Sequence, residues 1–214
     1  MDTRTITWVV FDLGETLVDE TRPWTAWAEY FDVPPLTFFA CLGAVIADRR
    51  PHTDVFEYFP PGFDPAVDTP LKEARFGPWS ASPEDLYADA VPTLTQLRAS
   101  GYKVAVMANQ PPSVEPFLAS LPVDAWATSS SWGVAKPDPA FFSRMAQELH
   151  AEPSQIAYVG DRVDNDVLPA KSAGMLAIHL RRGPWGLIHA TWPEAALADV
   201  HLDGLTDLPA ALRR

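Results

Sequence analysis

The chain has 214 residues, of which 47% are hydrophobic and 11% aromatic, so it carries enough apolar surface for a sizeable core and is not a disordered sequence. Its formal charge of −12 and its pI near 4.7 give a field that repels phosphate backbones and anionic lipid, so we expect neither nucleic acid nor a membrane as a partner. The single cysteine, Cys41, excludes an internal disulfide, and with no membrane-spanning window or leader evident we expect a cytoplasmic protein.

The first predicted element is a buried strand over residues 6–11, an almost entirely apolar and β-forming run. The strand ends in Asp12, and residues 13–16 form a turn rather than more strand. Because the carboxyl ends of strands in an α/β sheet open into the crevice where ligands bind, Asp12 stands where chemistry is usually done. Asp12 is therefore the first candidate catalytic residue.

Residues 18–88 are predicted to form an inserted, mainly helical cap. Two amphipathic helices are indicated by apolar residues at helical spacing, one after Pro23 and one after Pro34. The apolar residues in question are Trp24, Trp27, Ala28, Phe31, Phe38, Leu42, Val45 and Ile46. The segment from Pro51 to Trp79 is rich in proline and aromatic residues, which predicts compact irregular structure, and we expect hinges at 18–20 and 86–88.

Beyond residue 88, helices with apolar spacing alternate with short β-rich runs, which predicts βαβ units and a parallel sheet. The predicted helices are 90–100, 114–121, 139–149, 164–173 and 206–212, and the predicted strands are 102–107, 125–128, 156–159, 176–180 and 200–202. A flexible surface loop is expected at 183–186. We therefore predict an α/β fold with a Rossmann-like core made of residues 1–17 and 89–214.

Four positions that can carry chemistry each follow a predicted strand. They are Asp12, Ala108 with Asn109, Lys136 and Asp161. In a parallel sheet these strand ends face the same side, so we expect the four positions to converge.

Four segments, in this order, make the chain resemble the haloacid dehalogenase superfamily. They are FDLGETL at 11–17, VMANQ at 106–110, GVAKPDPAFF at 133–142 and VGDRVDNDVLPAKSAGM at 159–175. This superfamily consists of hydrolases that use a strand-end aspartate as nucleophile, and most of them are Mg²⁺-dependent phosphatases. The resemblance covers most of the core, including its Rossmann-like fold, and none of the cap.

The resemblance implies a role for each matching residue. Asp12 would attack phosphorus and form an aspartyl-phosphate, and Lys136 would neutralise the nucleophile and the transferring group. Mg²⁺ would be held by Asp12, the backbone carbonyl of Gly14, Asp161 and Asp166. A divalent cation is also what three neighbouring carboxylates need, because without one they would repel each other strongly.

Two positions depart from the family pattern. Gly14 stands where phosphatases of the family carry a second aspartate that protonates the leaving oxygen, and Ala108 replaces a Ser/Thr that binds the phosphoryl oxygens. We expect Glu15 or a water to take over the first role, and the predicted substrate-binding positions are Ala108, Asn109 and Gln110. Without the acid, good leaving groups should be preferred, and Gly14→Asp should raise turnover on alkyl esters.

Three functions are compatible with these motifs. The first is an Mg²⁺-dependent phosphohydrolase acting on a small phosphorylated metabolite, and the second is a non-catalytic binding protein with the same fold. The third is a 2-haloacid dehalogenase, which needs no second aspartate because halide leaves without a proton, although Asp161 and Asp166 would crowd its nucleophile. The phosphohydrolase hypothesis requires Asp12 and Asp161 to lie close enough to share one cation. In the cap, the aromatic residues either line a substrate pocket or form the cap's own core; those considered are Trp24, Trp27, Phe31, Phe38 and Phe39.

Overall fold

The described residues, 5–59 and 62–213 of the computed structural model, contain a six-stranded sheet in the order β3-β2-β1-β4-β5-β6. Every neighbouring pair is parallel. The strands are β1 (Trp8–Phe11), β2 (Lys103–Ala108), β3 (Ala125–Thr128), β4 (Ile156–Gly160), β5 (Leu176–Leu180) and β6 (Val200–Leu202). The predicted α/β fold with a Rossmann-like parallel sheet is confirmed.

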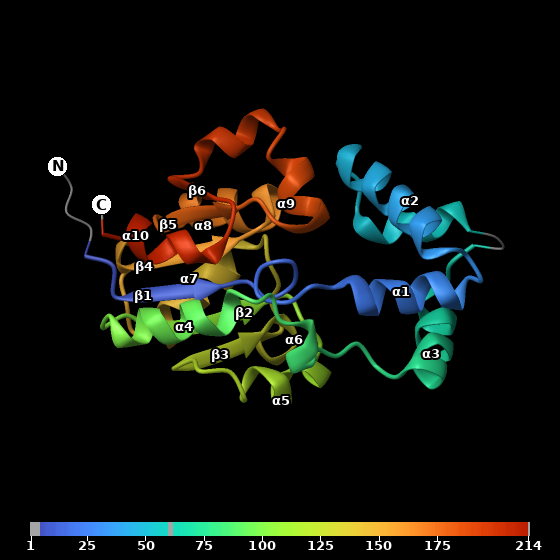
Figure 1. The fold of residues 1–214 in the computed structure, drawn as a ribbon, viewed down its shortest axis with the longest axis horizontal. Coiled ribbons are helices and arrows are strands. Elements are labelled where there is room, and N and C mark those ends of the chain that lie inside the picture. The colour runs from blue at the N-terminus through green and yellow to red at the C-terminus, as the bar shows by residue number, and fades with distance from the viewer. Residues whose placement is uncertain (1–4, 60–61, 214) are drawn as a thin grey trace.

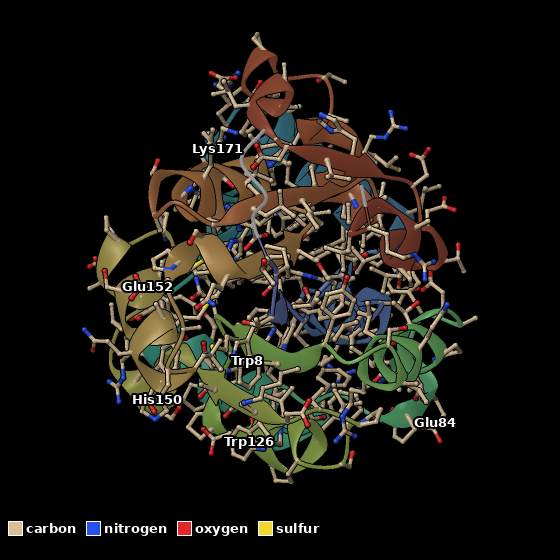
Figure 2. The ribbon with its side chains drawn as sticks, turned by 90° about the vertical axis from the view of Figure 1, so that its left-hand side faces the viewer. Trp8, Glu84, Trp126, His150, Glu152 and Lys171 are labelled. Atoms are coloured by element: carbon tan, nitrogen blue, oxygen red, sulfur yellow. The ribbon has the colours of Figure 1, made fainter. Side chains whose placement is uncertain are left out.

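Strand β1 lies where the strand order reverses, between β2 and β4. Phe11 at its end is in register with Val106 on one side and Val159 on the other. Ligands of open α/β sheets bind at this kind of switch point, outside the carboxyl ends of the strands. Figure 2 shows the opposite end of the molecule, with Trp8 at the start of β1 near its centre.

Helices cover both faces of the sheet because successive side chains of each buried strand point to opposite sides. In β1, Val9 and Phe11 pack in the core cluster shared with helices α4, α5 and α10, whereas Trp8 and Val10 pack in the cluster shared with α7 and α8. These helices are α4 (Ala90–Ala99), α5 (Glu115–Leu118), α7 (Pro139–Glu148), α8 (Leu168–Ser172) and α10 (Leu208–Ala211). Burial on both faces fixes β1, and therefore the residue that follows it.

Several core helices are shorter than predicted or divided. The predicted helix at 164–173 is a π-helical turn, Val163–Val167, followed by α8, and the helix at 114–121 is a 3₁₀ turn followed by α5. The remaining short elements are α6 (Ser129–Trp132) and the 3₁₀ segments Pro83–Asp85, Pro112–Val114, Pro153–Gln155, Pro193–Leu197 and Leu205–Asp207. Prolines at or near the starts of most of these segments favour short turns of this kind.

The segment between β1 and α4 contains α1 (Thr21–Tyr30), α2 (Pro35–Ala47), a 3₁₀ segment (His52–Tyr58) and α3 (Pro65–Phe76). Figure 1 shows these helices gathered beyond the carboxyl ends of the strands. The prediction of irregular structure up to Trp79 is wrong, because it missed α3. That helix forms because the Asp64 side chain accepts from the N–H of Ala66, Pro65 occupies the first turn, and Gly77 with φ 81° ends it.

Residues 183–186, expected to form a flexible loop, instead begin helix α9 (Gly183–His189). Trp185 of this helix is only 6% exposed and belongs to the aromatic cluster of the cap, where its ring lies 6.0 Å from that of Trp24. A Gly-Pro-Trp-Gly run reads as a turn, but burial of the indole, worth roughly 2 kcal/mol or more, favours an ordered helix. Helix α9 thus connects the core to the cap.

Within the residues that the structure describes, no single helix is long and apolar enough to cross a bilayer; α1 and α2 meet the length and composition criteria only as a pair, and they are bent by 109°.

Candidate active site

Asp12 lies directly beyond the end of β1, at the carboxyl edge of the sheet. Its backbone N–H donates to the carbonyl of Val159 in β4 at 2.9 Å, so the chain stays tied to the sheet for one residue past the strand. Its side chain is 13% exposed, and Oδ1 accepts from Nζ of Lys136 at 2.8 Å. The carboxylate is therefore held rigidly while one side remains open.

The side chain of Lys136 is fully buried and reaches the same point from the loop after α6. Its Nζ donates to Oδ1 of Asp12 at 2.8 Å, to Oδ1 of Asp166 at 2.5 Å and to the hydroxyl of Tyr158 at 2.8 Å. Burial acts to lower the pKa of Lys136, but the carboxylates of Asp12 and Asp166 outweigh it and raise that pKa well above its ordinary value. The ammonium is therefore a permanent positive charge.

Asn109, a predicted substrate-binding residue, is bound to the backbone of Lys136. Its Nδ2 donates to the Lys136 carbonyl and its Oδ1 accepts from the Lys136 N–H, both at 2.8 Å. This pair of bonds positions the lysine loop. Of the other two predicted positions, Gln110 borders the cavity, whereas Ala108 is fully buried in β2. Binding of substrate by these three residues stays a prediction.

Three carboxylates, those of Asp12, Asp161 and Asp166, each offer an oxygen within 4.8 Å of the others. Asp161 follows β4 and is 2% exposed, and its Oδ2 has no hydrogen-bond partner in the described part of the chain. Burial, together with the charges of Asp166 and Asp12, raises the pKa of Asp161 well above its ordinary value. Asp166 approaches this point because residue 160 is glycine, where a Cβ would lie 2.4 Å from the Asp166 Cγ.

These side chains fit a divalent cation. Three acidic groups face one ammonium, so the cluster carries an excess of two negative charges when all are ionised. In addition, Oδ2 of Asp161 is buried without a hydrogen-bond partner among the described residues, and a cation would give it one. Oxygen ligands of this kind are those that Mg²⁺ prefers. Gly14, the fourth predicted ligand, lines the same cavity.

Glu15, the predicted substitute for the missing acid, has both carboxylate oxygens occupied. Oε2 accepts from the hydroxyl of Tyr87 at 2.7 Å, and Oε1 accepts from the backbone N–H of Glu20 at 2.9 Å. Its φ of 52° is a left-handed conformation, which these two bonds hold in place. Burial raises the pKa of Glu15. The Glu15 side chain thus stabilises the turn between β1 and α1 through these two hydrogen bonds.

Sequence reasoning missed Glu20, which lies on the wall of the cavity together with Asp12. Its carboxyl accepts long hydrogen bonds, each 3.4 Å, from Nε1 of Trp24 and Nε2 of Gln110. Burial, followed by the charges of Glu15 and Asp12, raises the pKa of Glu20 to about 8. In the sequence, an acidic residue one position before a helix reads as an N-cap, yet Glu20 makes no side-chain cap bond to α1.

The cavity between the sheet edge and the cap has a volume of about 420 Å³. Polar residues of the core line one part of it, and the cap contributes mainly aromatic residues together with Glu20, His52, Thr53 and Thr69; the aromatic ones are Trp24, Trp27, Phe56, Phe63 and Trp79, with Trp185 of α9. The cap aromatics were expected either to line a substrate pocket or to form the cap's own core, and Trp24 and Trp27 do part of each. Both are less than 10% exposed in the cap core, and both border the cavity.

Positive charge is scarce at the aromatic end of the cavity. Arg162 is bound by Asp164 through two hydrogen bonds of 3.1 and 2.8 Å, and its guanidinium lies over the ring of Trp185. His52 borders the same end, and burial lowers its pKa to about 4, so it is neutral at pH 7. Among the described lining residues, both cations, Lys136 and Arg162, are ion-paired.

A model of the haloacid dehalogenase-like hydrolases matches residues 6–174, which is most of the chain and includes the first three motif segments and all but the last residue of the fourth. The chain belongs to this family. The match begins just before β1, the strand that Asp12 follows, and ends in the turn after α8, so it contains the whole acidic cluster.

Two relatives in the haloacid dehalogenase-like family are phosphatases. The chain is 36% identical to a glyceraldehyde 3-phosphate phosphatase of Methanopyrus kandleri over 114 residues, which is 46% of this chain and 45% of the relative. It is 33% identical to a phosphoglycolate phosphatase of Haemophilus influenzae over 103 residues, which is 46% of each. The chain thus matches less than half the length of either relative.

Solved structures agree with the fold. The L-2-haloacid dehalogenase of Xanthobacter autotrophicus, solved with chloropropionic acid covalently bound, superposes with a TM-score of 0.66 over 98% of this chain and 99% of that one. The identity is 18%, so the likeness shows the fold alone.

Proposed function

We propose that the protein is an Mg²⁺-dependent phosphohydrolase that cleaves small phosphorylated substrates through an aspartyl-phosphate on Asp12. The observation that carries this proposal is the cluster of Asp12, Asp161 and Asp166 within 4.8 Å, balanced in part by Lys136. Had Asp12 and Asp161 pointed into separate regions, they could not share a cation. The phosphatase relatives support the same class of reaction.

In this function, an oxygen of Asp12 bonds to phosphorus while the bond from phosphorus to the leaving oxygen breaks, and water then hydrolyses the aspartyl-phosphate. Lys136 holds Asp12 in position and reduces its repulsion toward the incoming phosphate. When bound, Mg²⁺ would supply positive charge to the phosphoryl oxygens, and Asp12, Asp161 and Asp166 would hold it. Asn109 fixes the lysine loop through the two bonds to its backbone.

The far end of the cavity suits an apolar or aromatic group on the substrate. Aromatic side chains line it together with the uncharged side chains of His52, Thr53 and Thr69, and the two cations that line the cavity are already paired, so a carboxylate at that end would be buried without an opposite charge. This is the opposite of what a second acidic group, such as the carboxylate of phosphoglycolate, would require. We therefore propose phosphate esters of neutral, apolar alcohols or phenols as the substrate class.

The alternatives receive less support from the geometry. A 2-haloacid dehalogenase would place a carboxylate substrate beside the two further acids, Asp161 and Asp166, next to its nucleophile. The structural likeness to dehalogenases concerns the fold alone. A non-catalytic binding protein would not need a strand-end carboxylate that is held by an ammonium and open to the cavity, as Asp12 is, whereas a nucleophile does.

The test is hydrolysis of p-nitrophenyl phosphate with Mg²⁺ and with EDTA, by wild type, D12N and the control D48N, which changes an exposed aspartate of the cap. We expect activity in wild type and D48N with Mg²⁺, a loss of at least 100-fold in D12N or with EDTA, and an acid-stable phosphoryl adduct on Asp12 in quenched wild type. Equal activity in D12N, or full activity in EDTA, would overturn the proposal.

A further inference from the structure

Cleavage of an alkyl phosphate leaves an alkoxide that must gain a proton, so a phosphohydrolase of the kind proposed above needs a proton donor near Asp12. Gly14 provides no side chain for this purpose. A side chain that gives this proton would have to come from another residue of the cavity wall, and this inference rests on the proposed function.

The cavity offers few candidates within the described residues. Lys136 is ion-paired with Asp12 and Asp166, and Asp161 is buried in the acidic cluster that would hold the cation. Glu15 has both oxygens engaged by Tyr87 and by the chain at residue 20. His52 lies among the cap aromatics, its ring 5.7 Å from Trp24 and 6.2 Å from Trp185. Glu20 remains.

The carboxyl of Glu20 occupies the space next to Gly14. A Cβ built on Gly14 would lie 2.2 Å from Oε1 and 2.5 Å from the carboxyl carbon of Glu20. Any side chain at position 14 would thus begin where this carboxyl already lies. Since Gly14 is only two residues from Asp12 and all three border one cavity, Glu20 places an acidic group beside the nucleophile.

The turn between β1 and α1 brings Glu20 to this place. Gly14 and Val18 form an isolated bridge, and the N–H of Glu15 donates to the carbonyl of Val18 at 2.7 Å. The N–H of Glu20 then donates to the Glu15 side chain at 2.9 Å, which folds the chain back over Gly14. The two partners of the Glu20 carboxyl are both donors, 3.4 Å away, so the carboxyl is oriented but not saturated.

We propose that Glu20 is the general acid and base of this site, supplying from the start of the cap the carboxyl that residue 14 lacks. In the first step Asp12 bonds to phosphorus, the ester bond breaks, and Glu20 gives its proton to the departing oxygen, releasing an alcohol. In the second step the Glu20 carboxylate takes a proton from water, whose oxygen bonds to phosphorus as the bond to Asp12 breaks. Phosphate leaves and both side chains are restored.

The test compares wild type, E20Q and the control E29Q, which changes an exposed glutamate of helix α1, on two esters with Mg²⁺. With p-nitrophenyl phosphate, whose leaving group needs no proton, E20Q should release a stoichiometric burst and then accumulate phosphoenzyme, detected by intact mass. With n-propyl phosphate, E20Q should lose roughly 10²- to 10⁴-fold in the phosphorylation step itself. E29Q should match wild type on both.

A second pair of variants keeps the proposal falsifiable should E20Q fold poorly. The E20A change removes the carboxyl, and G14D/E20A returns one from position 14 into the vacated space. We expect G14D/E20A to hydrolyse propyl phosphate at least tenfold faster than E20A. We expect G14D alone, which forces two carboxyls into one space, to hydrolyse it no faster than wild type. This revises the sequence-based expectation that Gly14→Asp by itself raises turnover on alkyl esters.

Equal losses on both esters without phosphoenzyme, or unchanged propyl phosphate turnover in E20Q, would overturn the assignment of Glu20 while leaving the function of Asp12 intact. If wild type hydrolyses neither ester and forms no phosphoenzyme, the proposed function fails and this inference fails with it.

Discussion

At the scale of single residues, the site depends on charges that are buried but compensated. Lys136 satisfies two carboxylates and a tyrosine hydroxyl at once, so its removal would take the balancing charge from Asp12 and Asp166, although Asp166 would still accept from the backbone N–H of Arg162. Removing one member of a buried ion pair typically costs about 3–5 kcal/mol, far more than losing a surface pair. The lysine is thus part of the fold as well as of the proposed chemistry.

We expect K136M to lower the free energy of unfolding by about 3 kcal/mol or more, and Mg²⁺ to restore part of this loss, because a cation can take over the balancing charge. Urea denaturation with and without Mg²⁺ measures both effects. K171M, which removes the surface pair with Asp199, is the matched control and should cost less than about 1 kcal/mol with no response to Mg²⁺. A K136M protein as stable as wild type would contradict the prediction.

At the scale of elements, helix α9 joins the cap to the strand ends. Trp185 packs in the cap cluster, while Nδ1 of the buried His189 accepts from the N–H of Val163 at 3.1 Å in the π-helical turn. His189 also stacks on Trp192, with ring centroids 3.7 Å apart. An accepting Nδ1 requires a neutral ring, so this contact between elements depends on protonation.

Burial lowers the pKa of His189 to about 4, although Asp164 beside it acts in the opposite direction. In the unfolded chain the pKa is about 6.5, so the unfolded state binds more protons between pH 6.5 and 4, and the stabilising contribution is complete above pH 6.5 and falls as the pH drops toward 4. We expect the free energy of unfolding to fall in that window, with a shallower slope in H189Q. An H189Q slope equal to that of wild type would contradict the prediction.

At the scale of the whole molecule, the cavity forms only because the cap lies over the carboxyl edge of the sheet, as Figure 1 shows. One end is acidic and lies on the core, and the other is aromatic and belongs mostly to the cap. We therefore propose that the cap selects the substrate, while the core supplies the nucleophile and the start of the cap supplies the general acid Glu20. Our division into a core of residues 1–17 and 89–214 and a cap of residues 18–88 follows the same boundary and stays a proposal.

Trp79 tests this assignment, because it borders the cavity and packs edge-on against Trp24 with centroids 5.8 Å apart. An aromatic contact between Trp79 and the substrate would contribute roughly 0.5–1.5 kcal/mol to binding, so W79A should raise KM for an aryl phosphate about 3- to 10-fold and change kcat little. The control W126A removes an exposed tryptophan of the edge strand β3, which is not among the residues that line the cavity, and should leave KM unchanged. Equal effects in both variants would argue against the aromatic wall.

The sequence by itself determined the sheet and the acidic cluster, because both depend on local pattern. A buried apolar run followed by an acid, repeated along the chain, places Asp12 and Asp161 at the same edge of a parallel sheet, and the family motifs add Lys136 and Asp166. All six strands fell within a few residues of their predicted positions. Alternation of strands and helices is enough to fix these features, since parallel strands require crossover helices.

Only the tertiary structure decided where the side chains of Glu20, Trp185 and Asn109 lie and what they contact. Glu20 reads as a helix cap until the turn folds it over Gly14, and Trp185 reads as part of a loop until the cap buries it. Asn109 faces the backbone of Lys136, which lies 27 residues further along the chain. Each of these roles comes from contacts between segments distant in sequence or folded by a specific turn, and local periodicity carries no information about such contacts.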